Sequence, residues 1–158
     1  MTPTVHVMQG LPAAGKTTLA TKLCASAARP LRRVSLDGLR LMLDGAARQA
    51  WWPPGQETAT QRAEAALVAQ LAADDCDVIV DDTHLYPEQA DPLRAALAGA
   101  RVRWCVHRVA TPPTVCLLRD VARVDPVGAA CIRDLHARHR AAADAGWRLT
   151  PGWLRGTP

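Results

Sequence analysis

Short apolar runs alternate along the chain with longer stretches rich in alanine and leucine. Four runs have the length of a buried strand, at residues 5–9, 33–36, 78–80 and 102–106. The stretches between them predict helices at residues 16–28, 37–47, 57–74 and 87–98, another from Pro112 and Pro113 through Arg119, and a last one at 128–142. This alternation predicts an α/β fold with a parallel sheet and right-handed crossovers.

The composition fits a single domain that spans residues 1–158. A length of 158 residues with 49% apolar content suffices for one core, and no repeat or linker interrupts the pattern. Aromatic residues make up only 4%, so the core should consist mostly of leucine, valine and alanine. In the tail at residues 146–158, Trp147 and Trp153 are expected to clamp the chain onto the body.

Charge and cysteine content bear on the setting of the protein. The net charge of +4 comes from an excess of arginine, which is compatible with phosphate-bearing partners, although a solvated surface is the commoner cause. The five cysteines are odd in number and include no C-x-x-C pair, which favours buried, reduced thiols over disulfides or metal ligands. No apolar run approaches the roughly 20 residues of a membrane span. We therefore expect a cytoplasmic protein with no membrane partner.

The segment after the first strand, Gly10-Leu11-Pro12-Ala13-Ala14-Gly15-Lys16-Thr17, fits the pattern G-x-x-x-x-G-K-[ST] in full. A strand before it and a helix after it are the context that a phosphate-binding P-loop requires. Glycines let backbone N–H groups face a polyphosphate, Lys16 adds positive charge, and the Thr17 hydroxyl is a hard ligand for Mg²⁺. The sequence thus predicts that residues 10–17 and Thr18 bind ATP, or another nucleoside triphosphate, with Mg²⁺.

A pair of carboxylates, Asp81 and Asp82, follows the third predicted strand. A carboxylate at that strand end can organise Mg²⁺ and its waters opposite Thr17, which is the place of a Walker B acid. Asp pairs at strand ends also serve as turn or cap residues. Beside a P-loop we favour the metal role, and we assign it to Asp82.

Asp37 follows the second predicted strand directly, so it should lie at the carboxyl edge of the sheet, where ligands bind in such folds. Arg40, three residues later, falls on the same side of the predicted helix. Together they could accept the proton of a hydroxyl group and hold a neighbouring anion. The alternative is a helix-capping Asp with an ordinary i,i+3 ion pair.

Arg119 and Arg123 lie four residues apart, just before a break at Asp125 and Pro126. On one helix face they could close over a nucleotide as a lid spanning about residues 119–130. An arginine at the transferring phosphoryl group is worth roughly 10³–10⁵ in rate. The alternative is two arginines on a solvated surface.

These elements together resemble the 5′-hydroxyl polynucleotide kinases of the bacteriophage and bacterial end-healing type. The likeness rests on the P-loop, on Asp37-x-x-Arg40, on Val80-Asp81-Asp82-Thr83-His84 and on Arg119-x-x-x-Arg123. The P-loop is shared by many proteins, whereas the Asp-x-x-Arg motif together with the arginine pair is far more specific. The four elements span nearly the whole chain.

The resemblance implies a role for each motif residue. It makes Asp37 the general base for a 5′-hydroxyl and Arg40 the ligand of the adjacent substrate phosphate. It places Arg123 at the transferring phosphoryl group and Arg119 on the nucleotide. Thr83 and His84 fall on the substrate side, and His84 stands where the family usually has asparagine.

We therefore predict a P-loop NTPase fold with a four-stranded parallel sheet in the order 2-3-1-4, flanked by helices and carrying a helical lid. The predicted activity is transfer of the γ-phosphate of ATP to a nucleic-acid hydroxyl, a 5′-OH end in first place. A hydroxymethylated base or a small molecule, as in the related antibiotic kinases and zeta-type toxins, is the first alternative. A nucleotide-binding switch or ATPase is the second. Asp37-x-x-Arg40 argues against that one, because a switch needs no acceptor base.

Three further features enter the sequence interpretation. The loop with Trp51 and Trp52 could stack bases of a single strand or latch onto the body. His136 and His139 have no companions at metal-ligand spacing and are expected to be solvated. His107, at the end of the fourth strand, is given no role.

Overall fold

The computed structural model of the protein describes residues 1–45 and 55–156. Its elements follow the chain in the order β1 (Thr4–Gln9), α1 (Lys16–Ser26), β2 (Leu31–Ser35), α2 (Leu36–Asp44), α3 (Gln56–Ala73), β3 (Asp77–Asp81), α4 (Pro87–Ala96), β4 (Arg103–Arg108), α5 (Pro113–Val121), α6 (Ala129–Asp144) and α7 (Pro151–Arg155). All predicted strands and helices are present, and α7 is additional. The pair Trp51 and Trp52 lies outside the described residues, so its stacking role stays a prediction.

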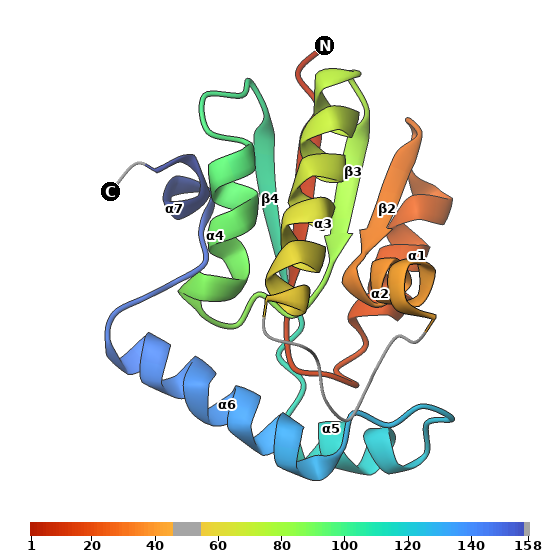
Figure 1. Ribbon diagram of the computed structural model, residues 1–158, viewed down its shortest axis with the longest axis vertical. Coiled ribbons are helices and arrows are strands. Elements are labelled where there is room, and N and C mark those ends of the chain that lie inside the picture. Colours follow the sequence, from red (N-terminus) through yellow and green to blue (C-terminus); the bar gives the residue numbers. More distant parts are fainter. Residues whose placement is uncertain (46–54, 157–158) are drawn as a thin grey trace.

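The four strands form one sheet in the order β2-β3-β1-β4, and every neighbouring pair is parallel, as predicted. In the register of the central strand, Val5 lies between Val78 of β3 and Trp104 of β4. All four strands point their carboxyl ends toward α5 and α6 (Figure 1). The segments that follow the strands therefore meet at that edge of the sheet.

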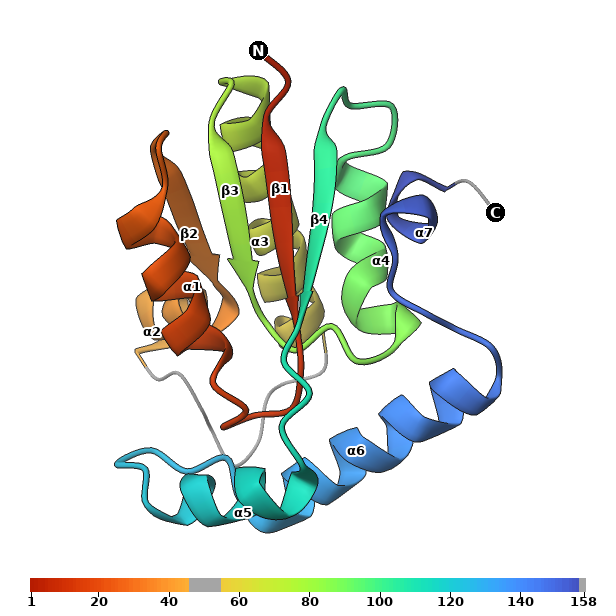
Figure 2. The same cartoon turned by 180° about the vertical axis from the view of Figure 1, so that it is seen from behind.

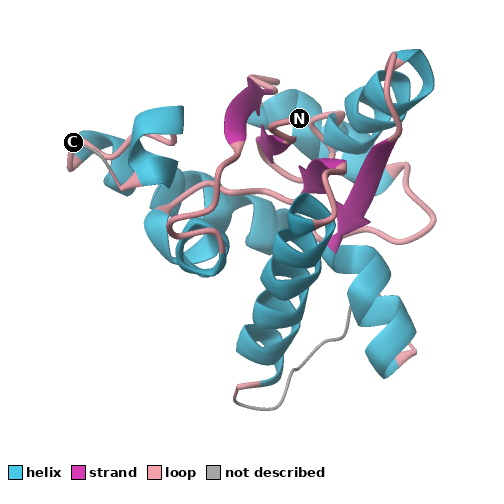
Figure 3. Cartoon of the chain, turned by 90° about the horizontal axis from the view of Figure 1, so that it is seen from above, coloured by secondary structure: helices cyan, strands magenta, loops and turns pink. Residues whose placement is uncertain are grey.

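Helices cover both faces of the sheet. Figure 1 shows α3 and α4 in front of it, and Figure 2 shows α1 on the opposite face. Seen along the strands, the sheet lies between these helices (Figure 3). None of the helices in residues 1–45 and 55–156 is long and apolar enough to cross a membrane.

The alternation of side chains along the strands builds two apolar layers. Val5 and Val7 of β1 face α3 and α4, whereas Met8 packs with Ile79 and Ala20 under α1. On α3, small residues such as Ala65 and Ala72 are buried, which lets the helix approach the sheet closely. The core is therefore built mainly of valine, leucine and alanine, as expected from the low aromatic content.

The C-terminal tail packs on the body through its tryptophans, as predicted. The rings of Trp147 and Trp153 meet edge to face with their centroids 5.6 Å apart, and both pack against the main core. The short helix α7 was not predicted, although Thr150 followed by Pro151 is a capping signal. The Thr150 hydroxyl accepts a hydrogen bond from the Trp153 amide at 3.0 Å.

Of the five cysteines, Cys116 is buried and Cys131 is exposed, while the remainder are half-buried. The expectation of buried thiols is therefore right for Cys116 and wrong for Cys131. The sequence indicated burial from apolar neighbours, but at position 131 those neighbours belong to the outer face of α6.

The loop between α5 and α6 is closed by a buried carboxylate. The side chain of Asp120, which is 2% exposed, accepts hydrogen bonds from the amides of Val127 (3.0 Å) and Gly128 (2.8 Å). These hydrogen bonds hold the end of the loop, which contains the predicted break at Asp125 and Pro126, against the end of α5. Helix α6 begins directly after the loop. A lid motion of this segment stays a prediction.

We expect Asp120→Ala to lower the free energy of unfolding by roughly 1.5–3 kcal/mol, the range for a hydrogen bond to a charged group. The substitution removes the acceptor of two amides, which then lose their partner. Urea denaturation measures the change, and Asp134→Ala on the exposed side of α6 is the matched control, with an effect within about 0.5 kcal/mol. Equal loss of stability in the two variants would contradict this account of the loop.

Candidate active site

The P-loop leaves β1 after Gln9 and enters α1 at Lys16. Two of its positions require glycine. A Cβ atom on Gly10 would lie 2.7 Å from the carbonyl oxygen of Val109, and Gly15 has a left-handed φ of 106°. The backbone of residues 10–15, the cradle of the P-loop, therefore passes close to Val109 and turns left-handed just before α1. A P-loop binds a polyphosphate through the amides of such a segment.

Several bonds tie this cradle to its surroundings. The Gly10 amide donates to the Thr83 carbonyl at 3.0 Å, and the Thr111 hydroxyl donates to the Ala14 carbonyl at 2.8 Å. The segments that follow β3 and β4 therefore both hold the P-loop. The P-loop and these two segments all lie at the carboxyl edge of the sheet. The hydrogen bonds between them therefore fix the position of the P-loop relative to Asp82.

Lys16 lies at the centre of the charged groups. Its side chain is buried and its Nζ donates to the Leu11 carbonyl at 2.8 Å. Burial lowers the pKa of Lys16, and the charges of Asp82, Asp81 and Asp37 act in the opposite direction. The ammonium group is therefore within electrostatic range of Asp82 and Asp37, which the sequence assigned to the metal and to the acceptor.

Asp37 and Arg40 are brought together as predicted. Arg40 Nη1 lies 2.6 Å from Asp37 Oδ1, within the first turns of α2. The N-cap of α2 is Ser35, whose hydroxyl accepts from the Gly38 amide, so Asp37 does not cap the helix. The i,i+3 ion pair of the alternative interpretation is nevertheless present. Any functional role of Asp37 therefore involves a carboxylate that is already paired with Arg40.

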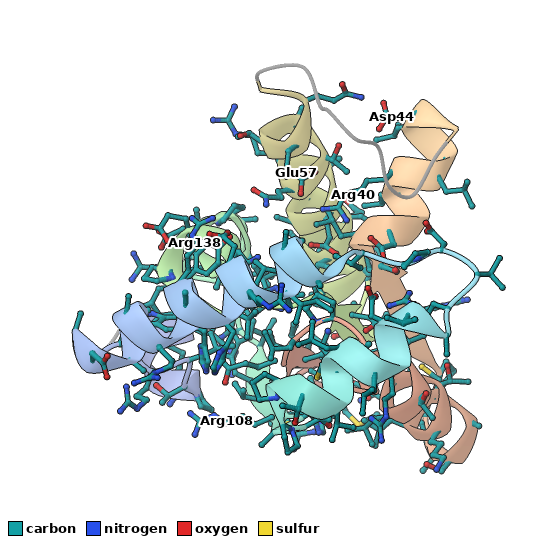
Figure 4. All side chains as sticks on the ribbon, turned by 90° about the horizontal axis from the view of Figure 1, so that it is seen from below. Arg40, Asp44, Glu57, Arg108 and Arg138 are labelled. Carbon is teal, nitrogen blue, oxygen red and sulfur yellow. The ribbon has the colours of Figure 1, made fainter. Side chains whose placement is uncertain are left out.

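Glu57 of α3 completes the arrangement around Arg40. Arg40 Nε donates to Glu57 Oε2 at 3.1 Å, and Nη2 forms a second bond with Oε1 of the same carboxylate. Figure 4 shows Arg40 and Glu57 pointing toward one another from α2 and α3. Two parallel hydrogen bonds to one carboxylate fix the orientation of the Arg40 guanidinium.

The two carboxylates after β3 have different surroundings. Asp81 is buried and accepts from Arg33 Nε (2.9 Å) and Nη2 (2.7 Å), so it holds β2 against β3. Asp82 is half-buried and lies near the Lys16 ammonium. Asp82 is therefore better placed than Asp81 to serve a ligand, and its role at the metal stays a prediction.

A second buried carboxylate, Glu64 of α3, lies beside Asp82. Donor atoms of Glu64, Asp82 and His84 lie within 4.8 Å of one another. Glu64 is 6% exposed, and its Oε1 has no hydrogen-bond partner among the described residues. Burial, and next the charge of Asp82, raise the pKa of Glu64 well above its usual range, while Arg40 partly opposes them.

His84 is buried and does not face solvent, where a substrate contact would be expected. Its ring is 1% exposed, and Nδ1 lies 2.9 Å from the Met8 carbonyl, which can only accept. The ring therefore anchors the loop after β3 to β1. A substrate contact by Thr83 or His84 stays a prediction.

The two lid arginines do not share a helix face, so that expectation is wrong. Helix α5 ends at Val121, so Arg119 lies in its last turn and Arg123 lies beyond it. Chain reversal at Asp120 stops the helix before a further turn can form. Arg119 Nη1 donates to the Ala14 carbonyl at 3.3 Å, which places it against the P-loop, whereas Arg123 is exposed.

The donor set suits a nucleotide with Mg²⁺. Thr17, exposed in the first turn of α1, and Asp82 both offer hard oxygen ligands, and the P-loop leads directly into the N-terminus of α1. The Glu64 side chain, whose Oε1 has no hydrogen-bond partner among the described residues, lies next to Asp82 as a further oxygen donor. The residues present therefore fit the group that the motif implies.

Sequence reasoning missed Glu57 and Glu64. Both lie on the stripe of α3 that also carries Thr60, Val68 and Ala72, and this stripe is polar in the first half of the helix and apolar in the second. Two acidic residues seven apart on the core-facing stripe of an otherwise alanine- and leucine-rich helix are a detectable signal that half of the helix faces a polar site.

Comparison with known proteins is consistent with this geometry. Residues 5–142 match the family described as an AAA domain (AAA_33), which covers most of the chain. No protein of curated function matches the chain in sequence.

Solved structures share the fold at low identity. A chain of the Pnkp1/Rnl/Hen1 RNA repair complex matches with a TM-score of 0.77 and 17% identity, over 91% of this chain and 46% of that chain. APS kinase CysC of Mycobacterium tuberculosis, in complex with AMPPNP and APS, gives 0.61 and 21%, over 90% and 76%. A gluconokinase from Sinorhizobium meliloti 1021 gives 0.57 and 15%, over 86% and 74%. The protein spans less than half the length of the RNA repair chain that it matches.

We expect Glu64→Gln to stabilise the metal-free protein increasingly as the pH rises. The native state holds the Glu64 proton to higher pH than the unfolded chain does, so the stability of the wild type falls as the pH rises from about 4.3 toward the raised native pKa. The difference between variant and wild type should grow across this window by up to about 1.4 kcal/mol per pH unit. Urea denaturation in EDTA measures it.

The control for this experiment is Glu88→Gln, which changes an exposed carboxylate at the start of α4. Its stability relative to the wild type should stay constant with pH. Parallel pH profiles for Glu64→Gln and the wild type would show that Glu64 is not a strained carboxylate.

Proposed function

The chain belongs to the family described as an AAA domain (AAA_33), and from that premise we propose that it transfers the γ-phosphate of ATP to a hydroxyl group of a nucleic acid, a 5′-OH end in first place. One observation carries the proposal. The Asp37 carboxylate, which lies 2.6 Å from Arg40 in the first turn of α2 directly after β2, is one of the charges that oppose the lowering of the Lys16 pKa by burial. A candidate base thus lies at the same carboxyl edge of the sheet as the phosphate-binding lysine.

The residues of the site divide the work of phosphoryl transfer. The P-loop amides and Lys16 would bind the polyphosphate, and Thr17 and Asp82 would hold Mg²⁺, which would supply positive charge at the phosphates. Asp37 accepts the proton of the attacking hydroxyl group. Glu57 fixes the Arg40 guanidinium so that it can orient an anionic acceptor next to Asp37.

The arginines of the α5 region supply charge at the transferring group. Arg119 already contacts the P-loop at the Ala14 carbonyl, so a small side-chain movement takes it to a bound phosphate. Arg123 lies on the loop that Asp120 closes, and closure of this segment would bring it over the nucleotide. We assign Arg119 to the nucleotide and Arg123 to the transition state.

Three observations support a polynucleotide as the acceptor. The chain has a net charge of +4, it carries the Asp-x-x-Arg and Arg-x-x-x-Arg motifs of the end-healing kinases, and its fold matches a chain of an RNA repair complex. A hydroxymethylated base or a small alcohol is the competing acceptor, since APS kinase and gluconokinase share the fold. The acceptor experiment below separates them.

We expect Asp37→Asn to bind ATP normally but to lose phosphorylation by at least about 10²-fold, the usual scale of a general base. The amide keeps the shape of the side chain and cannot take the proton. Calorimetry with AMPPNP and single-turnover labelling measure the two effects separately. Lys16→Ala is the reference variant, which should lose both nucleotide affinity and transfer. Weak nucleotide binding with normal turnover of the bound complex would instead make Asp37 a nucleotide or metal ligand.

We expect a short oligonucleotide with a 5′-OH end to be phosphorylated, and added salt to weaken its binding through lost phosphate contacts. Arg40→Ala should raise KM for the oligonucleotide far more than KM for ATP, because the guanidinium orients the acceptor. Arg101→Ala, an exposed arginine at the opposite end of the sheet, is the matched control and should change neither constant. Labelling of hydroxymethylated DNA or a small alcohol, with 5′-OH ends unlabelled, would overturn the acceptor and leave the kinase assignment intact.

A further inference from the structure

Three side chains with metal-binding donors gather on β1 and β4, on the face of the sheet opposite to α3 and α4. His6 is in register with Cys105, and His107 is in register with Met8, the next residue of β1 on that face. Val5 and Trp104, which alternate with them, pack into the main core on the other face. The pairing of the strands therefore places all three donors on one side.

The donor atoms already lie close together. His6 Nδ1 is 2.9 Å from His107 Nε2, and Cys105 Sγ is 3.5 Å from the same Nε2. The two imidazole rings stack with centroids 5.1 Å apart and planes 20° from parallel. One donor from each residue lies within 4.8 Å of the others.

The cluster is also accessible. His6, Cys105 and His107 are each half-buried. In Figure 2, α1 lies over the β2 side of the sheet, and among the described residues no helix crosses in front of β4. An ion could reach the cluster from solvent and keep a water molecule as a further ligand.

We propose that His6, Cys105 and His107 bind a thiophilic divalent cation of the Zn²⁺ class. Tetrahedral Zn²⁺ with bonds of about 2.05 Å to nitrogen and 2.3 Å to sulfur holds nitrogen atoms about 3.3 Å apart and nitrogen and sulfur about 3.6 Å apart. The observed separation of Cys105 Sγ from His107 Nε2 is 3.5 Å and fits directly. The contact of 2.9 Å between the histidines needs to open by about 0.4 Å, which small side-chain rotations provide.

The protonation of the cluster is compatible with binding. Burial lowers the pKa of both histidines; for His6, His107 and Arg103 lower it further and Asp77 raises it. Neutral imidazole is the form that binds metal. On binding, the histidine that donates the shared proton moves it to its other ring nitrogen, the Cys105 thiol releases its proton to solvent, and the thiolate binds the ion.

This site differs in chemistry from the candidate active site. Imidazole and thiolate favour Zn²⁺, whereas Thr17 and Asp82 offer oxygen ligands that suit Mg²⁺. The ion would join β1, which leads into the P-loop, to β4, which leads toward α5. The site does not rest on the proposed kinase activity.

The test uses the untagged, metal-free protein with excess Mg²⁺, so that the oxygen site is filled, and CoCl₂ as the spectroscopic probe. We expect one equivalent of Co²⁺ to produce the near-ultraviolet thiolate-to-cobalt band and the intense visible bands of four-coordinate cobalt. One equivalent of ZnCl₂ should abolish both. Weak six-coordinate bands alone would overturn the proposal and leave the cluster as a hydrogen-bonded histidine pair.

Variants locate the ion. Cys105→Ser should lose the thiolate band, and His107→Gln should keep a thiolate but lose the four-coordinate spectrum, with circular dichroism verifying that each is folded. The matched control is Cys131→Ser, on the exposed side of α6, which should leave the spectrum unchanged. A thiolate band that persists in Cys105→Ser, or disappears in Cys131→Ser, would place the ion elsewhere and refute the site.

Discussion

The buried ammonium group of Lys16 is the charge on which the rest of the site depends. It lies where the carboxyl ends of the strands meet, and Asp37, Asp81 and Asp82 all act on it. Asp81 is buried and needs a paired charge, whereas the Asp37 side chain is 43% exposed. Arg33 pairs with Asp81 and Arg40 pairs with Asp37, so the arginines that hold β2 and α2 in place are part of the same electrostatic network.

Glu64 stands apart in this network because its Oε1 has no partner in the described part of the chain. Leaving a buried carboxylate oxygen unpaired costs free energy, and a bound state of the site that pairs it would recover that cost. The neighbouring Asp82 and His84 suggest that this state is the one with nucleotide and cation bound. We infer that the site is built for its ligands at a cost to the empty protein.

The sequence was sufficient to predict the P-loop, the order of the strands in the sheet and the pairing of Asp37 with Arg40. The P-loop and the pair are local motifs, and the order of the strands follows from the P-loop fold that the motif and the strand-helix alternation indicate. It was insufficient for Glu57 and Glu64, since their roles arise only when α3 packs beside the carboxyl edge of the sheet. Likewise, spacing alone put Arg119 and Arg123 on one helix, whereas the buried Asp120 carboxylate ends that helix between them. Polar contacts between residues far apart in the chain are difficult to predict from the pattern of a single sequence.

The central claim is that Asp37 directs the γ-phosphate to a hydroxyl group and not to water. The most direct measurement follows γ-labelled ATP in the presence of a 5′-OH oligonucleotide and separates labelled acceptor from free phosphate. We expect the label in the oligonucleotide, with free phosphate a minor product. Release of all label as free phosphate, at a rate that does not change when acceptors of any class are added, would contradict the account.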